Sequence, residues 1–144
     1  MFTGEYHHNL DNKGRIAIPA QFRGNLRDGA TLTRGLDKCL TIYPRRSWTL
    51  LVNKLANLSI VQANSRAFVR FMLSGAKNSS LDKQGRVIIP EYLRRYAGIK
   101  KKVVIIGLFD KIELWSEERW IKYRADTEKK SNQIAEKLGE LGGI

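Results

Sequence analysis

An aspartate, a glycine and an arginine recur at the same spacing in this chain, as Asp-x-x-Gly-Arg over residues 11–15 and again over residues 82–86. Aspartate at the first position and glycine at the fourth are typical of a type I turn in which the glycine takes the left-handed conformation. An arginine directly after such a turn presents a planar fork of N–H donors, which fits phosphate oxygens or the O6 and N7 atoms of guanine. The pattern therefore predicts two turns that bind an anionic partner such as DNA.

The side chains of the two turns divide into shaping and binding roles. DNA would repel a carboxylate, so we expect the aspartates to accept hydrogen bonds from turn N–H groups and to orient the arginines. The residues expected to shape the turns are Asp11, Gly14, Asp82 and Gly85. The residues expected to contact DNA are Arg15 and Arg86, with further phosphate or base contacts from Lys13, Lys83, Asn12 and Gln84.

A simpler interpretation is that each Asp–Arg pair is an intramolecular salt bridge that only holds its turn. An exposed pair of this kind contributes about 0–1 kcal/mol to stability. It explains the aspartates, but neither the lysine in each turn nor the net charge of +12, from 26 Lys and Arg against 14 Asp and Glu. We therefore favour the binding role for Arg15 and Arg86, whereas Lys83 and Asn12 fit either interpretation.

The two turns belong to a longer internal repeat. Residues 10–23 align with residues 81–94 at an offset of 71, and seven of the 14 aligned positions are identical. Each turn is expected to join two short strands as a hairpin, and the proline that follows suits the first position of a helix. The strand candidates are residues 5–10, 15–18, 30–33, 39–43, 103–106 and 111–115, and the helix candidates are residues 20–26, 48–58, 60–76, 91–97 and a segment that Ser116 would cap.

These elements predict an α+β fold in four parts. The parts are a first half-domain over residues 1–58, a helical linker over residues 59–77, a second half-domain over residues 78–124 and a charged C-terminal tail over residues 125–144. Units of about 50 residues bury little surface alone, so we expect the two halves to share one core. The large apolar residues assigned to that core, rather than to an interface, include Phe68, Phe71, Met72, Trp115 and Trp120.

Composition narrows the class of partner. A pI near 10.1 indicates a polyanion, which could be DNA, RNA or an anionic membrane surface, although such charge also serves solubility. The longest apolar run, Val103–Ile106, is too short to span a membrane, and the N-terminal residues show no secretory pattern. Cys39 is the single cysteine, so no internal disulfide is possible and a cytoplasmic location is expected.

The sequence contains little evidence of a catalytic or metal-binding site. His7, His8 and Cys39 do not have the spacing of a zinc site, so no metal or other cofactor is expected. The sequence has no glycine-rich phosphate loop and no nucleophile elbow. We therefore expect neither an enzyme nor a small-molecule substrate.

Two tandem Asp-x-x-Gly-Arg turns, each followed by Ile-Pro and a helix, resemble the AbrB-type swapped-hairpin fold, and residues 1–124 resemble the MraZ family of transcriptional regulators. The other motifs that carry the resemblance are Met1-Phe2-x-Gly4-Glu5-Tyr6, Leu40-x-Ile42-Tyr43-Pro44 and Glu113-Leu114-Trp115-x-x-x-x-Trp120. The resemblance implies an intramolecular pseudo-dimer whose halves contribute strands to a shared barrel. It also implies a nucleoid-associated, ring-shaped homo-oligomer on double-stranded DNA, at short direct repeats in the promoter of the bacterial cell-division and cell-wall gene cluster.

Two other binding functions stay open. An RNA reader usually offers exposed aromatic side chains for stacking, and the turns contain none, which argues against that class. An antitoxin-like interaction module is the main alternative, because the AbrB-type fold also serves in such proteins. Its partner-wrapping segment would have to be the tail over residues 125–144.

Overall fold

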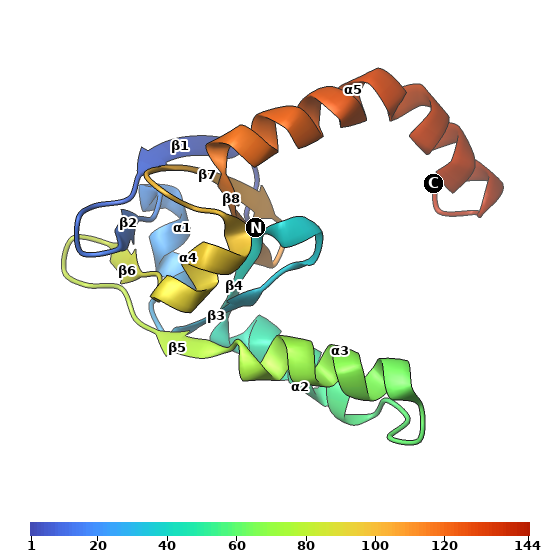
Figure 1. The fold of residues 1–144 in the computed structure, drawn as a ribbon, viewed down its shortest axis with the longest axis horizontal. Coiled ribbons are helices and arrows are strands. Elements are labelled where there is room, and N and C mark those ends of the chain that lie inside the picture. The colour runs from blue at the N-terminus through green and yellow to red at the C-terminus, as the bar shows by residue number, and fades with distance from the viewer.

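The computed structural model describes residues 1–144, which form eight strands and five α-helices (Figure 1). The strands are β1 (Glu5–Asn9), β2 (Arg15–Ala17), β3 (Ala30–Arg34), β4 (Leu40–Pro44), β5 (Lys77–Ser79), β6 (Arg86–Ile88), β7 (Lys102–Leu108) and β8 (Lys111–Ser116). The α-helices are α1 (Ala20–Arg23), α2 (Arg45–Ala56), α3 (Ala63–Ser74), α4 (Glu91–Ala97) and α5 (Glu117–Glu140), and short 3-10 helices cover Gly24–Leu26 and Leu36–Lys38. The fold is therefore mixed α+β, as the sequence predicts.

The sheets join the two halves by exchanged strands. Six strands form an antiparallel sheet in the order β1-β7-β8-β4-β3-β5, and β2 pairs with β6 in a second sheet. The repeat makes β5 the counterpart of β1, β7 the counterpart of β3 and β8 the counterpart of β4, so the order of equivalent strands is the same from either end. The pairs β1–β7, β3–β5, β4–β8 and β2–β6 all join different halves. Neither half contains a complete sheet.

One hydrophobic core lies between the halves. It contains 19 buried residues that come from both copies of the repeat. In the small sheet Ile16 lies opposite Val87, and at the centre of the large sheet Leu40 lies opposite Leu114. Burying a large apolar side chain contributes roughly 1.5–3 kcal/mol. Because the buried side chains come from both halves, this stabilisation is gained only when the two halves fold together.

The prediction of two hairpins is wrong, because the strands on either side of each turn do not pair with each other. β1 pairs with β7, and β2 pairs with β6. β2 and β6 have only three residues each, and pairing with one another gives both strands a buried face at Ile16 and Val87. The closed barrel is not confirmed, because the hydrogen-bonded order ends at β1 and β5, which do not pair with each other.

Most element boundaries agree with the sequence to within two residues, and the exceptions have local causes. Pro19 and Pro90 are the N-caps of α1 and α4, one position earlier than predicted, with extended backbone. Gly98 ends α4 in the left-handed conformation, as the sequence predicts. Leu58 lies beyond the end of α2, and β5 was not predicted from the sequence.

Two helices, α2 and α3, pack outside the main core. α2 and α3 lie side by side and share a small cluster around Tyr43, Leu55 and Met72 (Figure 1). Phe68 on α3 is 36% exposed, so its predicted place in the core is wrong, whereas Met72 and Trp115 are buried. No helix combines the length and apolar character needed to cross a membrane.

The long helix α5 covers the end of the second half-domain and most of the expected tail. Ser116 caps it by accepting a hydrogen bond from the Arg119 N–H at 3.5 Å, and two glutamates occupy the first turn, where the helix dipole favours them. The helix then continues without a break to Glu140. Every residue from 125 to 144 is exposed, and this part of the helix projects from the body (Figure 1).

Candidate nucleic-acid interface

The carboxylate of Asp11 organises the first turn. Its Oδ1 atom accepts hydrogen bonds from the backbone N–H groups of Lys13 at 2.9 Å and Arg15 at 2.8 Å. Gly14 donates its N–H to the Asp11 carbonyl and has a φ of +78°, a left-handed conformation that favours glycine. This arrangement is what the turn-shaping role of Asp11 and Gly14 requires.

The second turn repeats this geometry. Asp82 Oδ1 accepts hydrogen bonds from the backbone N–H groups of Gln84 and Arg86, both at 2.9 Å. Gly85 donates its N–H to the Asp82 carbonyl and has a φ of +75°. Two segments 71 residues apart therefore reach the same local structure from the same motif.

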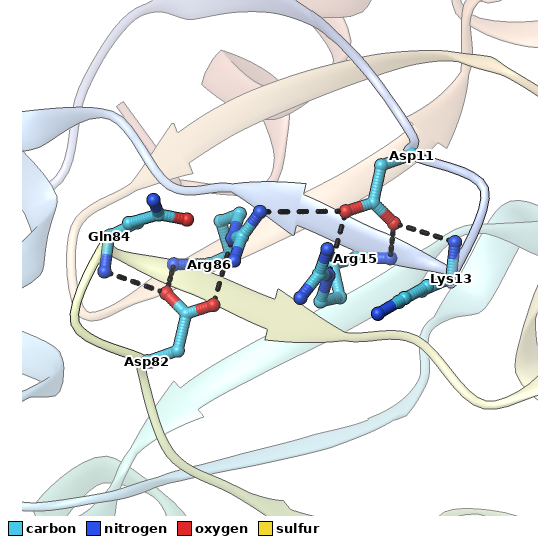
Figure 2. Close-up of polar contacts among 6 residues, drawn as sticks. All are labelled: Asp11, Lys13, Arg15, Asp82, Gln84 and Arg86. Atoms are coloured by element: carbon cyan, nitrogen blue, oxygen red, sulfur yellow. Dashed lines mark hydrogen bonds and ion pairs between the residues drawn. The ribbon is translucent and has the colours of Figure 1, made fainter.

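The other oxygen of each aspartate holds an arginine. Arg15 Nε donates to Asp11 Oδ2 at 2.7 Å, and Arg86 Nε donates to Asp82 Oδ2 at 2.8 Å. The terminal nitrogens make no hydrogen bond, and the nearest carboxylate contact is 3.8 Å, from a terminal nitrogen of Arg86 to Asp11 Oδ2. Figure 2 shows both arginines lying between the two aspartates. Each salt bridge thus orients an arginine and leaves free the donors that a phosphate or a guanine would use.

Hydrogen bonds between the halves hold the two turns together. Ile18 donates its N–H to the Gly85 carbonyl at 2.9 Å, and Ile89 donates its N–H to the Gly14 carbonyl at 2.8 Å. Each turn is therefore attached to the strand end of the other half. The turns lie at the same side of the molecule, at the ends of the β2–β6 sheet (Figure 1).

The β2–β6 sheet has one buried face and one face that carries the arginines. Successive residues of a strand point to opposite faces, so Ile16 and Val87 face the core while Arg15 and Arg86 share the outer face. Ile88 lies directly opposite Arg15 and is 60% exposed, which is unusual for a large β-branched side chain. The outer face of the sheet thus combines two oriented cations with one exposed apolar group.

The electrostatics of the turns keep both aspartates ionised. The backbone N–H of Arg15, assisted by its side chain and by the Lys13 N–H, lowers the pKa of Asp11 against the opposing effect of partial desolvation. The Arg86 N–H and side chain lower the pKa of Asp82 in the same way. Both carboxylates therefore stay charged at neutral pH and hold the arginines in place.

The four remaining candidate residues are exposed at the turn tips. Lys13 and Gln84 use their backbone N–H groups within the turns, and the side chains of both make no hydrogen bond. The side chains of Asn12 and Lys83 are likewise exposed and unpaired. All four side chains are thus available to an external ligand.

A family model described as "MraZ protein, putative antitoxin-like" matches residues 1–71 and, a second time, residues 72–140. The chain belongs to the MraZ family. The second match extends into the tail, whereas the motifs seen in the sequence end near residue 124.

Relatives from several bacteria are similar to this MraZ-family chain over nearly its full length. Proteins named "Transcriptional regulator MraZ" from Halothermothrix orenii, Clostridium acetobutylicum and Clostridium tetani are 52%, 51% and 50% identical to it over 142 residues. Each alignment covers 99% of this chain and 99% of the relative. The two halves and the long helix thus all lie within the aligned length.

Two further arginines of this MraZ-family chain lie against the turns, and their role was not predicted from the sequence. The guanidinium of Arg23 on α1 packs over Gly85, and that of Arg94 on α4 packs near Gly14. Each arginine thus contacts the turn of the other half. A Cβ atom at Gly85 would collide with the side chain of Arg23, so a larger residue there would displace this arginine as well as strain the turn. The repeated Phe-Arg and Leu-Arg pairs after the proline were the only signal available.

A polar network that was not predicted from the sequence attaches α5 to β1. Glu5 accepts hydrogen bonds from Trp120 Nε1 at 2.9 Å and from a terminal nitrogen of Arg124 at 2.7 Å. The ring of His7 lies between two carboxylates, 2.8 Å from Glu5 Oε2 and 3.2 Å from Glu117 Oε2. No group of three or more His, Cys, Asp or Glu side chains is placed to hold a metal ion, and this includes the network around His7.

Raising the pH is expected to weaken the attachment of α5 to β1. Hydrogen bonds to Glu5 and then to Glu117 raise the pKa of His7 above its ordinary value of 6.5. The stabilisation is therefore complete below pH 6.5 and is lost as the pH rises through the higher pKa of the folded state. Because the His7 side chain is 47% exposed, the effect should be small and local.

Hydrogen exchange in the first turn of α5, corrected for the intrinsic pH dependence, measures this effect. Protection should fall across the titration of His7 in the wild type and stay level in His7→Gln. Equal pH dependence in both proteins would contradict the role given to His7.

Proposed function

We propose that this chain binds double-stranded DNA through its two turns and regulates transcription from a promoter. The observation that carries the proposal is the pair Arg15 and Arg86, each oriented through Nε and each with free terminal donors on one face of a two-stranded ribbon. A two-stranded β-ribbon fits the major groove, and arginine recognises guanine there through two parallel hydrogen bonds. The relatives' name, transcriptional regulator, supports the same function, and we propose no catalytic role.

The proposal extends to the assembly that binds. The exchanged strands support an intramolecular pseudo-dimer that presents both turns together, and a single chain still offers only a small footprint. We propose a ring-shaped homo-oligomer with a head-to-tail interface that binds short direct repeats. Linked sites of this kind can raise the apparent affinity by about 10²–10⁴. By family resemblance, the target promoter would precede the cell-division and cell-wall gene cluster.

Binding to duplex DNA should be tight and strongly salt-dependent. The net charge of +12 is distributed over both halves and the linker, and each phosphate neutralised contributes about −0.9 to the slope of log K against log salt. The measurement is a titration of the full chain with a fluorescent duplex from the DNA upstream of its own gene, at several salt concentrations. Single-stranded RNA of matched length and a shuffled duplex serve as competitors.

The competitors separate the possible outcomes. Displacement by the specific duplex alone supports the proposed function. Preferential displacement by the RNA would assign the chain to another class of nucleic-acid binder, and a slope near zero would remove the electrostatic basis of the proposal.

An antitoxin-like role is the second candidate, because the family description contains that term and because residues 125–144 are exposed along their whole length. A segment that wraps a partner is usually disordered when free, whereas this one continues a helix. The test is a pull-down with the full chain and with a variant that ends after Arg124. A stoichiometric small protein that is lost with the tail would favour this candidate over DNA binding as the main role.

A further inference from the structure

A cationic cavity lies beside the second turn and is not part of the arginine pair described above. Its volume is about 330 Å³, and its polar lining consists of Arg23, Arg27, Lys83, Ser80 and Asp82. Three of these five side chains are therefore cations, and they come from both halves of the chain. α1 and the segment after it supply the two arginines, and the turn supplies the lysine.

The charges in this cavity have no counter-ion within the protein. Arg23, Arg27 and Lys83 form none of the salt bridges of the structure. Asp82 is the one acid of the lining, and both of its carboxylate oxygens already accept hydrogen bonds from the turn and from Arg86. The cavity thus gathers positive charge that an external anion would neutralise.

Arg23 is fixed in the wall of the cavity rather than free in solvent. Its Nε donates to the Ile18 carbonyl at 2.9 Å, and its guanidinium lies against Gly85. Arg27 and Lys83 are exposed and can move toward a ligand. One held cation between two adjustable cations, with the Ser80 hydroxyl nearby, is a suitable set of donors for a phosphate group.

The first turn has no equivalent set of cations. At the repeat offset of 71, Asn12 stands in place of Lys83, and Gly98 stands in place of Arg27. Arg94 is the counterpart of Arg23, but its Nε atom is buried without a hydrogen-bond partner. The first turn carries its lysine one position later, at Lys13, so three cations beside the second turn correspond to Arg94 and Lys13 beside the first, and no cation replaces Arg27.

The side chains on the outer face of the small sheet also differ between the two halves. Ile88 is exposed there, and its counterpart in the first half is Ala17. The backbone of the molecule is nearly symmetric, whereas the side chains on its proposed DNA-binding side are not.

We propose that the cavity formed by Arg23, Arg27 and Lys83 binds a phosphate of the DNA backbone, and that its restriction to one turn gives each chain a fixed direction on the duplex. This inference rests on the proposed function and deepens it. A chain with two equal turns would match a palindromic site. A chain with one extra phosphate contact distinguishes the two directions of its site, so neighbouring copies bound in the same way are satisfied by repeats in the same orientation.

The test compares Arg27→Ala, Arg27→Lys and the control Arg46→Ala with wild type. Arg46 is exposed on α2, which lies away from both turns, so its loss removes the same charge from another place (Figure 1). Two readouts are used on a duplex from upstream of the chain's own gene: the salt dependence of binding, and interference by ethylation of single phosphates.

We expect wild type to show a phosphate interference pattern that is unequal on the two sides of each repeat. Arg27→Ala should lose the interference on one side only and should reduce the steepness of the salt slope by about 1 for each bound chain. Arg27→Lys should keep both features because it keeps the charge, and Arg46→Ala should resemble wild type.

Other outcomes overturn the inference in distinguishable ways. Specific binding by wild type with an unchanged pattern and slope in Arg27→Ala would refute the phosphate site and leave the proposed function intact. Equal losses in Arg27→Ala and Arg46→Ala would show a general charge effect and would also refute the site. Absence of duplex binding by wild type would refute the proposed function itself.

Discussion

Replacing Arg15 by alanine is expected to weaken binding to the specific duplex by about 5- to 150-fold, and Arg86→Ala should do the same, because a bidentate arginine contact to a base is worth roughly 1–3 kcal/mol. The salt bridges to the aspartates hold the arginines through Nε and leave the terminal donors for the ligand. The side chains are only about a quarter exposed, yet each bridge lies at the surface, so its removal should change stability by about 0–1 kcal/mol. Fluorescence titration and thermal melting of the same samples measure both effects.

Arg46→Ala is the matched control for these variants, because it removes one exposed cation from a helix that lies away from both turns (Figure 1). Its affinity should stay close to that of wild type. If Arg15→Ala and Arg86→Ala bind as tightly as the control, the arginines only hold the turns and the simpler interpretation of the motif is correct. If either variant melts far below wild type, lost affinity would reflect unfolding rather than lost contacts.

Leu114→Ala is expected to lower the free energy of unfolding of the whole chain by about 2–5 kcal/mol, the cost of truncating a buried leucine. Leu114 is fully buried on β8 and lies opposite Leu40 on β4, where the large sheet joins the two halves. Because four of the six strand pairs join different halves, the protein should still unfold in one transition. Chemical denaturation followed by tryptophan fluorescence and by far-UV circular dichroism measures the change.

The same substitution at Leu138 controls for chemistry without burial. Leu138 lies on the exposed end of α5 and is 43% exposed, so Leu138→Ala should change stability by at most about 0.5 kcal/mol. Two separate transitions in Leu114→Ala, one for each half, would contradict the shared core. Equal effects at Leu114 and Leu138 would contradict the assignment of Leu114 to that core.

Local structure was largely predictable from the sequence because it depends on short-range chemistry. The turns follow from aspartate and glycine at fixed positions, and α4 follows from a proline before it and Gly98 after it. Strand boundaries follow from runs of β-branched residues such as Val103–Ile106, which lies within β7. In each case the residues that determine the element lie inside it or next to it.

Strand pairing was not predictable in the same way, because it depends on residues far apart in the chain. β2 and β6 are three residues long, and only the shared core decides that they pair with each other rather than with β1 or β5. β5 has the polar sequence Lys77–Ser79 and becomes a strand only because the edge of β3 is available. A repeat in the sequence shows that two halves are equivalent and does not show that they exchange strands.

The candidate interface also combines residues that could be predicted from the sequence with residues that could not. The turn motif identifies Arg15 and Arg86 directly, because the chemistry and the spacing stand together in the sequence. Arg23 acts on the turn of the other half, and Glu5 joins β1 to a helix more than a hundred residues later. Such contacts become visible only once the strands are exchanged and the helices are placed.

Hydroxyl-radical footprinting of the wild-type chain on the DNA upstream of its own gene tests the central claim most directly, since it reports both binding and sequence preference. The account predicts protection of short repeats in one orientation, lost together in Arg15→Ala and Arg86→Ala. No protection at concentrations that saturate a fluorescent duplex, or uniform protection of the whole fragment, would contradict sequence-specific binding by the two turns.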